Sequence, residues 1–421
     1  MRFSPILLGH AEALLGQLLR FDAPADSIVS RYFREHRQLG HADRGFVAET
    51  VYAVLRRKRS LAARCGEMPS ARQLVLAWMV CGQGLNRREL EPVLRGSESE
   101  WLAKVKGADL AALSEAVRFD LPDWLYAALS AQYPAAELAP LVESLVQGAP
   151  LDLRVNVLKA DRDRVLASLQ ADGIAAAPCP YSLFGIRLTG KPSLARHPLF
   201  LDGSVEVQDE GSQLLGLLVQ PKRGEMVADF CAGAGGKTLL LGAMMRSQGR
   251  LYAFDVSEKR LAKLKPRLAR SGLSNVHPVR IESEHDSKIK RLAGKLDRVL
   301  VDAPCSGLGT LRRNPDLKWR QSEASVAELA VKQASILASA ATLVKPGGRL
   351  VYATCSLLAA ENDAVVQGFL AAHPDFVLVS AAEILRRQGV EGLDEAGRET
   401  LQLVPHRHAT DGFFAAVMER R

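Results

Sequence analysis

Two of the six cysteines, Cys305 and Cys355, each follow a stretch that is typical of a buried β-strand. The first stretch, DRVLVD, ends at Asp302 and leads into DAPCSG (302–307), and the second ends in ATCS (353–356). The carboxyl ends of parallel strands meet at one edge of a sheet, where neighbouring strands lie about 4.8 Å apart. A lone cysteine is usually a small buried apolar residue. Two thiols at the tips of neighbouring strands indicate a reactive site instead.

A glycine-rich loop lies upstream, within MVADFCAGAGGKTLL (226–240). An apolar run ends at Asp229, the loop CAGAGG follows, and a helix is predicted to begin at Lys237. The glycines let the backbone turn sharply and approach a ligand, because they lack a Cβ atom. Neither the dinucleotide pattern GxGxxG nor the phosphate-loop pattern GxxxxGK[ST] is present. Taken alone, the loop also fits an ordinary turn in an α/β domain.

Acidic residues after the next two predicted strands indicate what this loop binds. Asp255 ends the following strand, 26 residues after Asp229, where such a side chain typically accepts hydrogen bonds from ribose hydroxyls. Glu282, Glu284 and Asp286 follow the third strand, and one of them is expected at an adenine amino group. A ribose acid and a third-strand acid without a pyrophosphate fingerprint favour S-adenosylmethionine over a dinucleotide.

Beside a methyl donor, two thiols suit methylation of cytosine at C5. That carbon is a poor nucleophile until a thiolate adds to C6, and the covalent step divides one difficult reaction into two easier ones. A second group must then remove the C5 proton so that the thiolate can leave. One of Cys305 and Cys355 would be the nucleophile and the other the base or release group, while Asp302 would hold the N3 and N4 edge of the base. The base must leave its stack to reach such a site.

The elements that must position these residues alternate between strands and helices from Val205 onward. This alternation predicts an α/β fold with a doubly wound, Rossmann-like sheet. The last strand is expected to be an antiparallel strand at the edge of a mixed sheet. Strands are predicted at 226–230, 250–255, 277–281, 297–302, 348–353, 376–379 and 412–418, and helices at 237–246, 257–271, 322–344 and 361–371.

Two further parts precede this core. The first reads as successive helices, because apolar residues recur three and four positions apart, and the second as a small α/β unit with strands at 151–158 and 184–188. The basic run Arg56–Arg59 is either a solvated helix face or an RNA-facing patch. The predicted domains are therefore a helical domain at 1–120, a small α/β subdomain at 121–205, and the α/β core at 206–421.

Composition narrows the classes of function. The net charge of +8 favours an acidic partner such as nucleic acid. The cysteines form no CxxC pair, so neither a zinc ribbon, nor another metal site, nor a disulfide framework is expected, and reduced thiols suit the cytoplasm. No run of about 18 apolar residues indicates a membrane span. Nothing in the sequence suggests an assembly larger than a monomer.

The motifs, in their order, resemble one known family. CAGAGGKT, DAPCSG and ATCS, together with VQDEGSQL (207–214) and DGFFAAVMER (411–420), are similar to the Sun/Nop family of RNA cytosine-C5 methyltransferases. The segment 42–61 resembles the RNA-binding helical domain of the antitermination factor NusB. These resemblances cover nearly the whole chain. They imply an all-α NusB-like domain, a small RNA-binding α/β subdomain and a Rossmann-like class I methyltransferase domain with a mixed sheet. The chain resembles most the bacterial members that act on 16S ribosomal RNA.

The resemblance also implies a role for each site residue. Cys355, in TCS, would be the nucleophile, and Cys305, in PCS, would act in product release, with Asp302 positioning the base. In this family the third-strand acid is usually Asp, whereas Glu282 aligns with it here. The family's S-adenosylmethionine contacts map onto Cys231, Ala232, Gly233, Ala234, Gly235, Gly236, Lys237, Asp255, Glu282 and Asp302.

Two other functions compete with this interpretation. DNA cytosine-C5 methyltransferases use a Pro-Cys nucleophile, which would make Cys305 the nucleophile, but no target-recognition domain follows the core. A non-catalytic RNA-binding or ribosome assembly factor could retain the fold. Such a factor would need neither of the two cysteines nor Asp302. We therefore expect an S-adenosylmethionine-dependent RNA methyltransferase.

Overall fold

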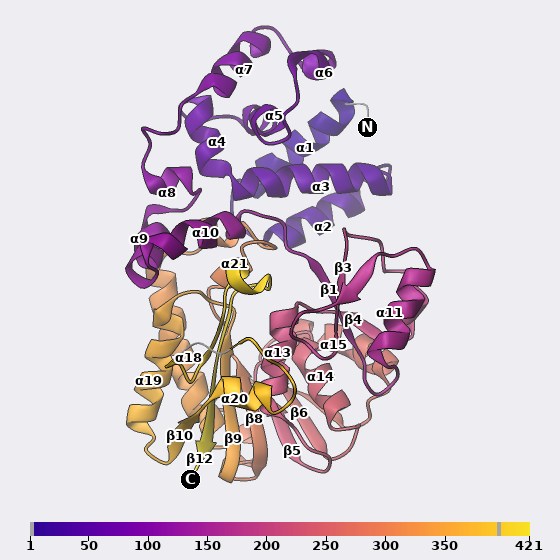
Figure 1. The fold of residues 1–421 in the computed structure, drawn as a ribbon, viewed down its shortest axis with the longest axis vertical. Coiled ribbons are helices and arrows are strands. Elements are labelled where there is room, and N and C mark those ends of the chain that lie inside the picture. Colours follow the sequence, from indigo (N-terminus) through magenta and orange to yellow (C-terminus); the bar gives the residue numbers. More distant parts are fainter. Residues whose placement is uncertain (1–3, 394–396) are drawn as a thin grey trace. The chain divides into compact units, whose positions relative to one another are not determined.

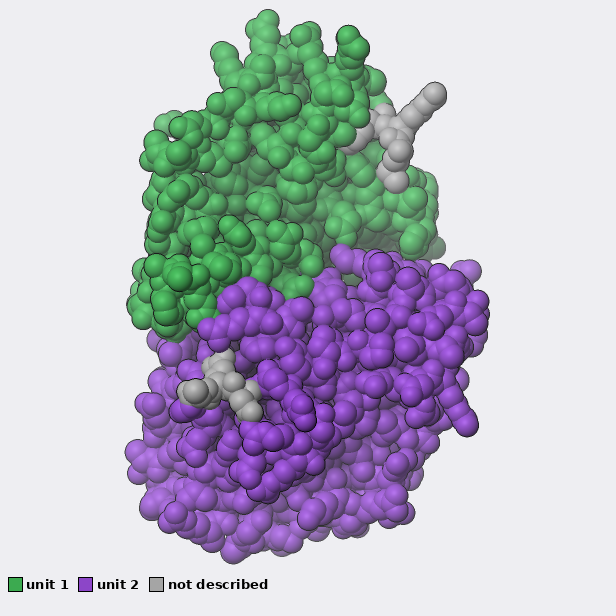
Figure 2. All heavy atoms as spheres, in the orientation of Figure 1, with its two compact units in different colours: residues 1–148, 310–323 green, residues 149–309, 324–421 purple. Residues whose placement is uncertain are grey.

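A computed structural model describes residues 4–393 and 397–421. The chain divides into two compact units, coloured separately in Figure 2. Unit 1 comprises Met1–Gly148 and Thr310–Glu323, and unit 2 comprises Ala149–Gly309 and Ala324–Arg421. These units differ from the three expected domains, because the helices after residue 121 and a short segment from inside the predicted core both belong to unit 1. Among the described residues, no helix has the length and apolar character needed to cross a membrane.

Unit 1 is built from helices around one apolar core, whose fully buried members include Leu14, Val51 and Leu76 (Figure 1). The helical character expected for the N-terminal part is confirmed, whereas the NusB-like identity stays a prediction. The elements are α1 Pro5–Leu18, α2 Ala25–Glu35, α3 His41–Arg56, α4 Lys58–Cys65, α5 Ala71–Cys81, α6 Arg87–Leu90, η1 Glu91–Val93, α7 Glu98–Gly107, α8 Glu115–Arg118, α9 Asp123–Gln132, α10 Ala135–Leu145 and, from the second segment, α17 Leu317–Arg320.

The basic run at the α3–α4 junction makes contacts within unit 1, and its role toward RNA stays a prediction. Arg56 is only 8% exposed, and its guanidinium donates to the carbonyl oxygen of Arg312 at 2.9 Å. Lys58 places its ammonium 4.7 Å from the ring centroid of Trp319. Arg59 pairs with Asp123 at the start of α9. These basic residues hold later segments of the chain within unit 1.

Unit 2 begins with a small antiparallel sheet in the order β2-β3-β1-β4. Its strands are β1 Leu151–Val155, β2 Ala176–Pro178, β3 Gly185–Leu188 and β4 Val205–Val207, with the helices α11 Arg162–Ala171 and α12 Pro198–Leu201. The predicted subdomain boundary at 205 is displaced, because β4 pairs with β1 through Val205 opposite Val155. The sequence analysis missed β2 and β4, which are only three residues long.

The larger sheet of unit 2 runs in the order β10-β12-β9-β8-β5-β6-β7, and β11 pairs with β12. Strands β5 to β9 are parallel to one another. Strand β12 is antiparallel to both β9 and β10. The last strand is thus antiparallel as predicted but does not form the edge, since β10 lies outside it. The strands are β5 Met226–Asp229, β6 Arg250–Asp255, β7 Val276–Arg280, β8 Leu296–Asp302, β9 Val344–Thr354, β10 Phe376–Val379, β11 Leu401–Leu403 and β12 Phe413–Arg420.

Helices cover both faces of this sheet, which confirms the Rossmann-like α/β class (Figure 1). One face packs against α13, α14, α15 and α20, and the other against α16, α18 and α19. Alternate residues of one strand serve the two cores: Val351 packs in the first and Tyr352 in the second. The helices are α13 Glu210–Val219, α14 Gly236–Met244, α15 Glu258–Ser271, α16 Ser287–Lys290, α18 Glu323–Ala341, α19 Asp363–Ala372, α20 Ala381–Arg386 and α21 Pro405–His408, with η2 Leu308–Thr310 and η3 Ala359–Glu361.

Lys318 gives unit 1 a testable dependence on pH. It is 2% exposed, donates to the carbonyl oxygen of Arg56, and burial lowers its pKa to about 7. Between pH 7 and 10.5 the unfolded chain therefore binds the proton that the folded chain has lost, so stability rises with pH. The rise from this residue reaches up to about 5 kcal/mol, at about 1.4 kcal/mol per pKa unit.

We expect Lys318→Met to abolish this rise, and the exposed control Lys104→Met to retain it. All four tryptophans, at positions 78, 101, 124 and 319, lie in unit 1. Urea unfolding followed by tryptophan fluorescence at pH 6 and pH 9 therefore reports on this unit. An equal rise in wild type and Lys318→Met would contradict the expectation.

Candidate active site

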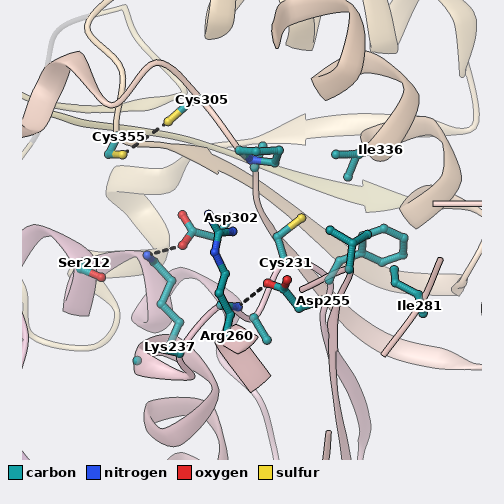
Figure 3. Close-up of a pocket in the computed structure, with 18 of the residues that line it drawn as sticks. Ser212, Cys231, Lys237, Asp255, Arg260, Ile281, Asp302, Cys305, Ile336 and Cys355 are labelled. Atoms are coloured by element: carbon teal, nitrogen blue, oxygen red, sulfur yellow. Dashed lines mark hydrogen bonds and ion pairs between the residues drawn. The ribbon is translucent and has the colours of Figure 1, made fainter. Parts of the chain in front are cut away.

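A cavity of about 550 Å³ opens at the carboxyl ends of the parallel strands of unit 2. Figure 3 shows the side chains that point into it from β6, β8, α14 and α18. It is lined by ten of the predicted site residues, namely Cys231, Ala232, Gly233, Ala234, Gly236, Lys237, Asp255, Asp302, Cys305 and Cys355. Gly235 and Glu282, which were also predicted as site residues, are not part of this lining.

The glycine-rich loop between β5 and α14 is held to the end of β6. Ala232 donates its backbone N–H to the carbonyl oxygen of Phe254 at 2.8 Å, and Gly233 donates to Asp255 Oδ2 at 2.8 Å. Gly235 has a φ of 83° and caps α14, and a Cβ atom there would lie 2.2 Å from Leu264. Gly235 therefore shapes the loop from behind the cavity, where only glycine fits. Asp255 anchors the loop with one oxygen while it lines the cavity.

Asp229, at the end of β5, lies buried beneath this loop. Thr238 donates to its Oδ2 at 2.6 Å, and Oδ1 has no partner among the described residues. Burial raises the pKa of Asp229 to about 7, with further contributions from the charges of Asp302 and Asp255. The sequence analysis used Asp229 only to mark a strand end. Its environment makes it a support for the loop rather than a group that lines the cavity.

Lys237 and Asp302 form an ion pair across the cavity floor, with 2.7 Å between Lys237 Nζ and Asp302 Oδ2 (Figure 3). Burial acts to lower the pKa of Lys237, but the Asp302 carboxylate outweighs burial and the pKa lies above its usual value. The side chain of Lys237 is only 10% exposed, whereas that of Asp302 is 30% exposed. No hydrogen bond from the described residues engages Asp302 Oδ1. One carboxylate oxygen is thus fixed by the ion pair, which also orients the other.

The two predicted cysteines meet, with 3.4 Å between Cys305 Sγ and Cys355 Sγ. Strands β8 and β9 are adjacent and parallel, with Asp302 opposite Ala353, so both motifs leave the sheet at the same edge (Figure 3). The hydrogen bond to Cys355, together with burial, raises the pKa of the Cys305 thiol well above its usual value. Cys305 therefore keeps its proton at neutral pH, beside the sulfur of Cys355.

Gly309 ties three motif-bearing loops together. Its backbone N–H donates to the carbonyl oxygen of Cys355 at 2.8 Å, and its own carbonyl oxygen accepts from the N–H of Gly412 at 2.8 Å. A Cβ atom at Gly309 would lie 2.2 Å from the carbonyl oxygen of Gly412 and 2.8 Å from that of Cys355. The close approach of these backbones therefore requires glycine.

The third-strand acid on the cavity is Glu284 rather than Glu282. Glu282 pairs with Arg280 and its side chain is 73% exposed, whereas Glu284 lines the cavity and is 7% exposed. Burial acts to raise the pKa of Glu284, but hydrogen bonds from Lys332 and Ser335 outweigh it and hold the pKa at about 2. Asp286, the third candidate, caps α16 and is no part of the lining. The turn after β7, and not distance along the sequence, selects the acid that reaches the cavity.

Several lining residues had no signal in the sequence analysis. Ile281 and Ile336 bring apolar side chains from the end of β7 and from α18. Arg260 and Arg267 come from α15, and Ser212 from α13. Ser212 lies in the motif VQDEGSQL (207–214) but was not singled out there. The other four lie outside the motifs, and the packing of helices against the sheet brings them to the site.

One group of potential metal ligands exists among the described residues, and an arginine side chain already pairs with its carboxylates. Asp152, Cys179 and Glu210 are buried and place ligand atoms within 4.8 Å of one another. Arg187 donates to Asp152 at 2.7 Å and pairs with Glu210 at 3.3 Å. A cation in that place is thus supplied by the chain, and the arrangement stabilises the joint between β1, β3 and α13.

Gly309→Ala should destabilise unit 2 by about 1–3 kcal/mol, because the added methyl group forces apart backbones that cannot yield. Gly368→Ala in α19 is the matched control, since nothing lies within 4 Å of a Cβ atom there, and alanine favours a helix by about 1 kcal/mol. Calorimetric unfolding of both variants checks the prediction. A Gly309→Ala protein as stable as Gly368→Ala would show that the loops can separate freely.

Known proteins resemble this chain along most of its length. A sequence model described as 16S rRNA methyltransferase RsmB/F matches residues 216–419, and one described as an RsmF/B-like ferredoxin-like domain matches residues 121–195. A Synechocystis protein named "Probable ribosomal RNA small subunit methyltransferase B" is 33% identical over 97% of this chain and 98% of its own length.

Two further relatives extend the comparison. "Ribosomal RNA small subunit methyltransferase B" of Sodalis glossinidius is 35% identical over 78% of this chain and 73% of its own. A solved structure of a methyltransferase homolog from Pyrococcus horikoshii has 30% identity and a TM-score of 0.63, covering 75% of this chain and all of that one. The chain therefore belongs to the RsmB/F family of 16S rRNA methyltransferases.

Proposed function

We propose that this protein transfers a methyl group from S-adenosylmethionine to C5 of a cytosine in RNA, through a covalent bond between Cys355 and C6. The observation that carries the proposal is the pair of thiols 3.4 Å apart on the rim of a cavity that also holds Asp302. The substrate proposed is 16S ribosomal RNA, which the family description names. The net charge of +8 suits an RNA partner.

The lining of the cavity fits S-adenosylmethionine. The backbone of the loop 231–236 lies beside the cavity with Asp255 at its end, where a ribose would find acceptors. Ile281 and Ile336 provide apolar surfaces for a flat base, and Glu284 provides a carboxylate for an amino group. Bound there, S-adenosylmethionine would supply an electrophilic methyl group.

Asp302 and Lys237 would hold the target cytosine. Lys237 fixes Oδ2 of the carboxylate at 2.7 Å, so Oδ1 has a defined direction and can accept from the N4 amino group of a flipped base. The ammonium of Lys237 also offsets the negative charge that the cavity would otherwise concentrate. A preorganised arrangement of charges is the usual way in which a site stabilises a reacting base.

The two thiols would take successive roles. Cys355 adds to C6 as a thiolate, and C5 then forms its new bond to the methyl carbon. Two of the causes that raise the pKa of Cys305 are its hydrogen bond to Cys355 and the negative charge of the Cys355 thiolate. Both are lost once Cys355 is bonded to C6. Cys305 can then release its proton to water and accept the C5 proton. The C6–S bond breaks, Cys355 leaves as a thiolate, and Cys305 is protonated again, so one proton is released overall.

Trapping with RNA that contains 5-fluorocytosine separates the two cysteines. Fluorine at C5 cannot leave as a proton does, so we expect the wild-type protein to accumulate a covalent adduct. Cys355→Ala should form none, because it lacks the nucleophile, whereas Cys305→Ala should accumulate adduct even on ordinary cytosine. The exposed Cys81 provides the control variant Cys81→Ala, which should behave as wild type.

Denaturing electrophoresis and mass mapping of the RNA-linked cysteine check this prediction. Loss of adduct in Cys305→Ala rather than Cys355→Ala would assign the nucleophile as in DNA cytosine methyltransferases. No adduct in any variant would favour a non-catalytic RNA-binding factor.

The substrate is tested in cells. Bisulfite sequencing of ribosomal RNA from cells with and without this gene should show one 16S cytosine that loses its C5 methylation when the gene is absent. Restoration by the wild-type gene and failure of the Cys355→Ala gene to restore it would link the modification to the site. Unchanged ribosomal RNA would contradict the proposed substrate.

A further inference from the structure

Glu361, at the end of η3, carries a carboxylate that is wholly buried beside the two thiols. Its Oε1 accepts from the backbone N–H of Ser306 at 2.8 Å and from Gln333 Nε2 at 3.0 Å. Its Oε2 accepts from the hydroxyls of Ser306 and Ser356, each at 2.5 Å. No lysine or arginine among the described residues pairs with it. A charge buried in this way depends on its hydrogen bonds, each of which contributes about 1.5–3 kcal/mol.

Except for Gln333, the groups that donate hydrogen bonds to Glu361 belong to the two cysteine loops. Ser306 follows Cys305 directly, and Ser356 follows Cys355 directly. One carboxylate therefore joins two loops that leave different strands and that lie 50 positions apart in the sequence. The two hydroxyls also lie 3.3 Å from each other, so the loops converge on Glu361 from both sides.

The next residue, Asn362, fixes the second loop further. Its Nδ2 donates to the carbonyl oxygen of Ser356 at 3.0 Å, and its Oδ1 accepts from the Thr354 hydroxyl at 2.5 Å. The Tyr352 hydroxyl donates to the carbonyl oxygen of Glu361 at 2.6 Å, which anchors η3 near the carboxyl end of β9. The carboxylate is thus attached to the rigid sheet and not to a free loop.

We propose that Glu361 is the positioning residue for both thiols: by accepting from Ser306 and Ser356, its carboxylate sets the 3.4 Å spacing of Cys305 Sγ and Cys355 Sγ. Glu361 touches neither substrate nor cofactor in this role. That the spacing serves methyl transfer rests on the proposed function, whereas the spacing itself does not. A misplacement of reacting groups by about 1 Å costs on the order of 100-fold in rate.

The negative charge of Glu361 also acts on Cys305. The pKa of that thiol is raised chiefly by its hydrogen bond to Cys355 and by burial, and the charge of Glu361 adds to them. The same carboxylate therefore keeps Cys305 protonated while it holds the two loops together. Glu361→Gln keeps the shape of the side chain, removes the charge and replaces one acceptor oxygen with a donor.

The rate at which Cys305 and Cys355 form a disulfide reports on the spacing of their sulfurs without any RNA. The oxidant diamide takes two electrons from the two thiols and accepts their protons, and a Cys305–Cys355 bond forms only when the sulfurs approach to about 2.05 Å. We expect Glu361→Gln to form this bond at least tenfold more slowly than wild type, as measured by mass mapping of the linked peptides. Affinity for S-adenosylmethionine should change less than twofold, while the single-turnover rate of adduct formation should fall about 100-fold.

Glu225→Gln is the matched control. Glu225 is a largely buried carboxylate that Arg298 holds at 2.7 Å, and it precedes the amino end of β5, whereas the thiols lie at the carboxyl ends of β8 and β9. It should lower the melting temperature but leave both the oxidation rate and the adduct rate at wild-type values. If Glu361→Gln does not fold, the double variant Ser306→Ala and Ser356→Ala removes the two tethers and is expected to show the same slow oxidation.

The outcomes separate the two proposals. Oxidation and adduct rates in Glu361→Gln that match wild type, or an equal loss in Glu225→Gln, would overturn the positioning role. Fast oxidation in wild type and slow oxidation in Glu361→Gln, with no RNA adduct in either protein, would uphold the positioning of the thiols and refute the proposed methyl transfer. Slow oxidation together with a slow adduct rate would support both.

Discussion

The parallel pairing of β8 with β9 is the constraint on which the rest of the site depends. It sets Asp302 opposite Ala353, and the bond from the Ala303 N–H to the Ala353 carbonyl oxygen carries the ladder beyond the strand ends. Cys305 and Cys355 therefore leave the sheet side by side. Parallel neighbours need a long crossover connection, supplied here by α18. The thiol pair is thus a consequence of topology, and neither cysteine motif has its partner until the sheet forms.

Buried charge around the site is stabilised in three different ways. Asp302 faces the cation of Lys237, and Glu361 is surrounded by neutral hydrogen-bond donors. Among the described residues, Asp229 has a single hydrogen-bond donor, the Thr238 hydroxyl. The consequences differ, because a charge without sufficient partners changes its protonation instead, as the raised pKa of Asp229 shows. An ion pair and a hydrogen-bonded carboxylate fix geometry, which is what a preorganised site requires.

Chain connectivity links unit 1 to the loop that carries Cys305. The chain leaves unit 2 after Gly309 and returns at Ala324, and the intervening segment is part of unit 1. Within that unit, Arg56 and Lys318 exchange bonds with the backbone of these two segments. Basic residues are seldom fully buried, so the sequence does not indicate that Arg56 and Lys318 are. Their burial came from long-range packing, which local patterns do not record.

The sequence by itself determined seven strands of the larger sheet but not the three-residue β11. It also determined the antiparallel direction of the last strand and the edge at which Cys305 and Cys355 meet. Apolar runs and the turn residues that end them report burial locally, so these features could be predicted. Only the tertiary structure placed β10 outside β12, turned Glu284 rather than Glu282 to the cavity, and set Glu361 between the two cysteine loops. These features depend on which segments pack together, and the energy of a buried polar group is decided by partners that lie far away in the chain.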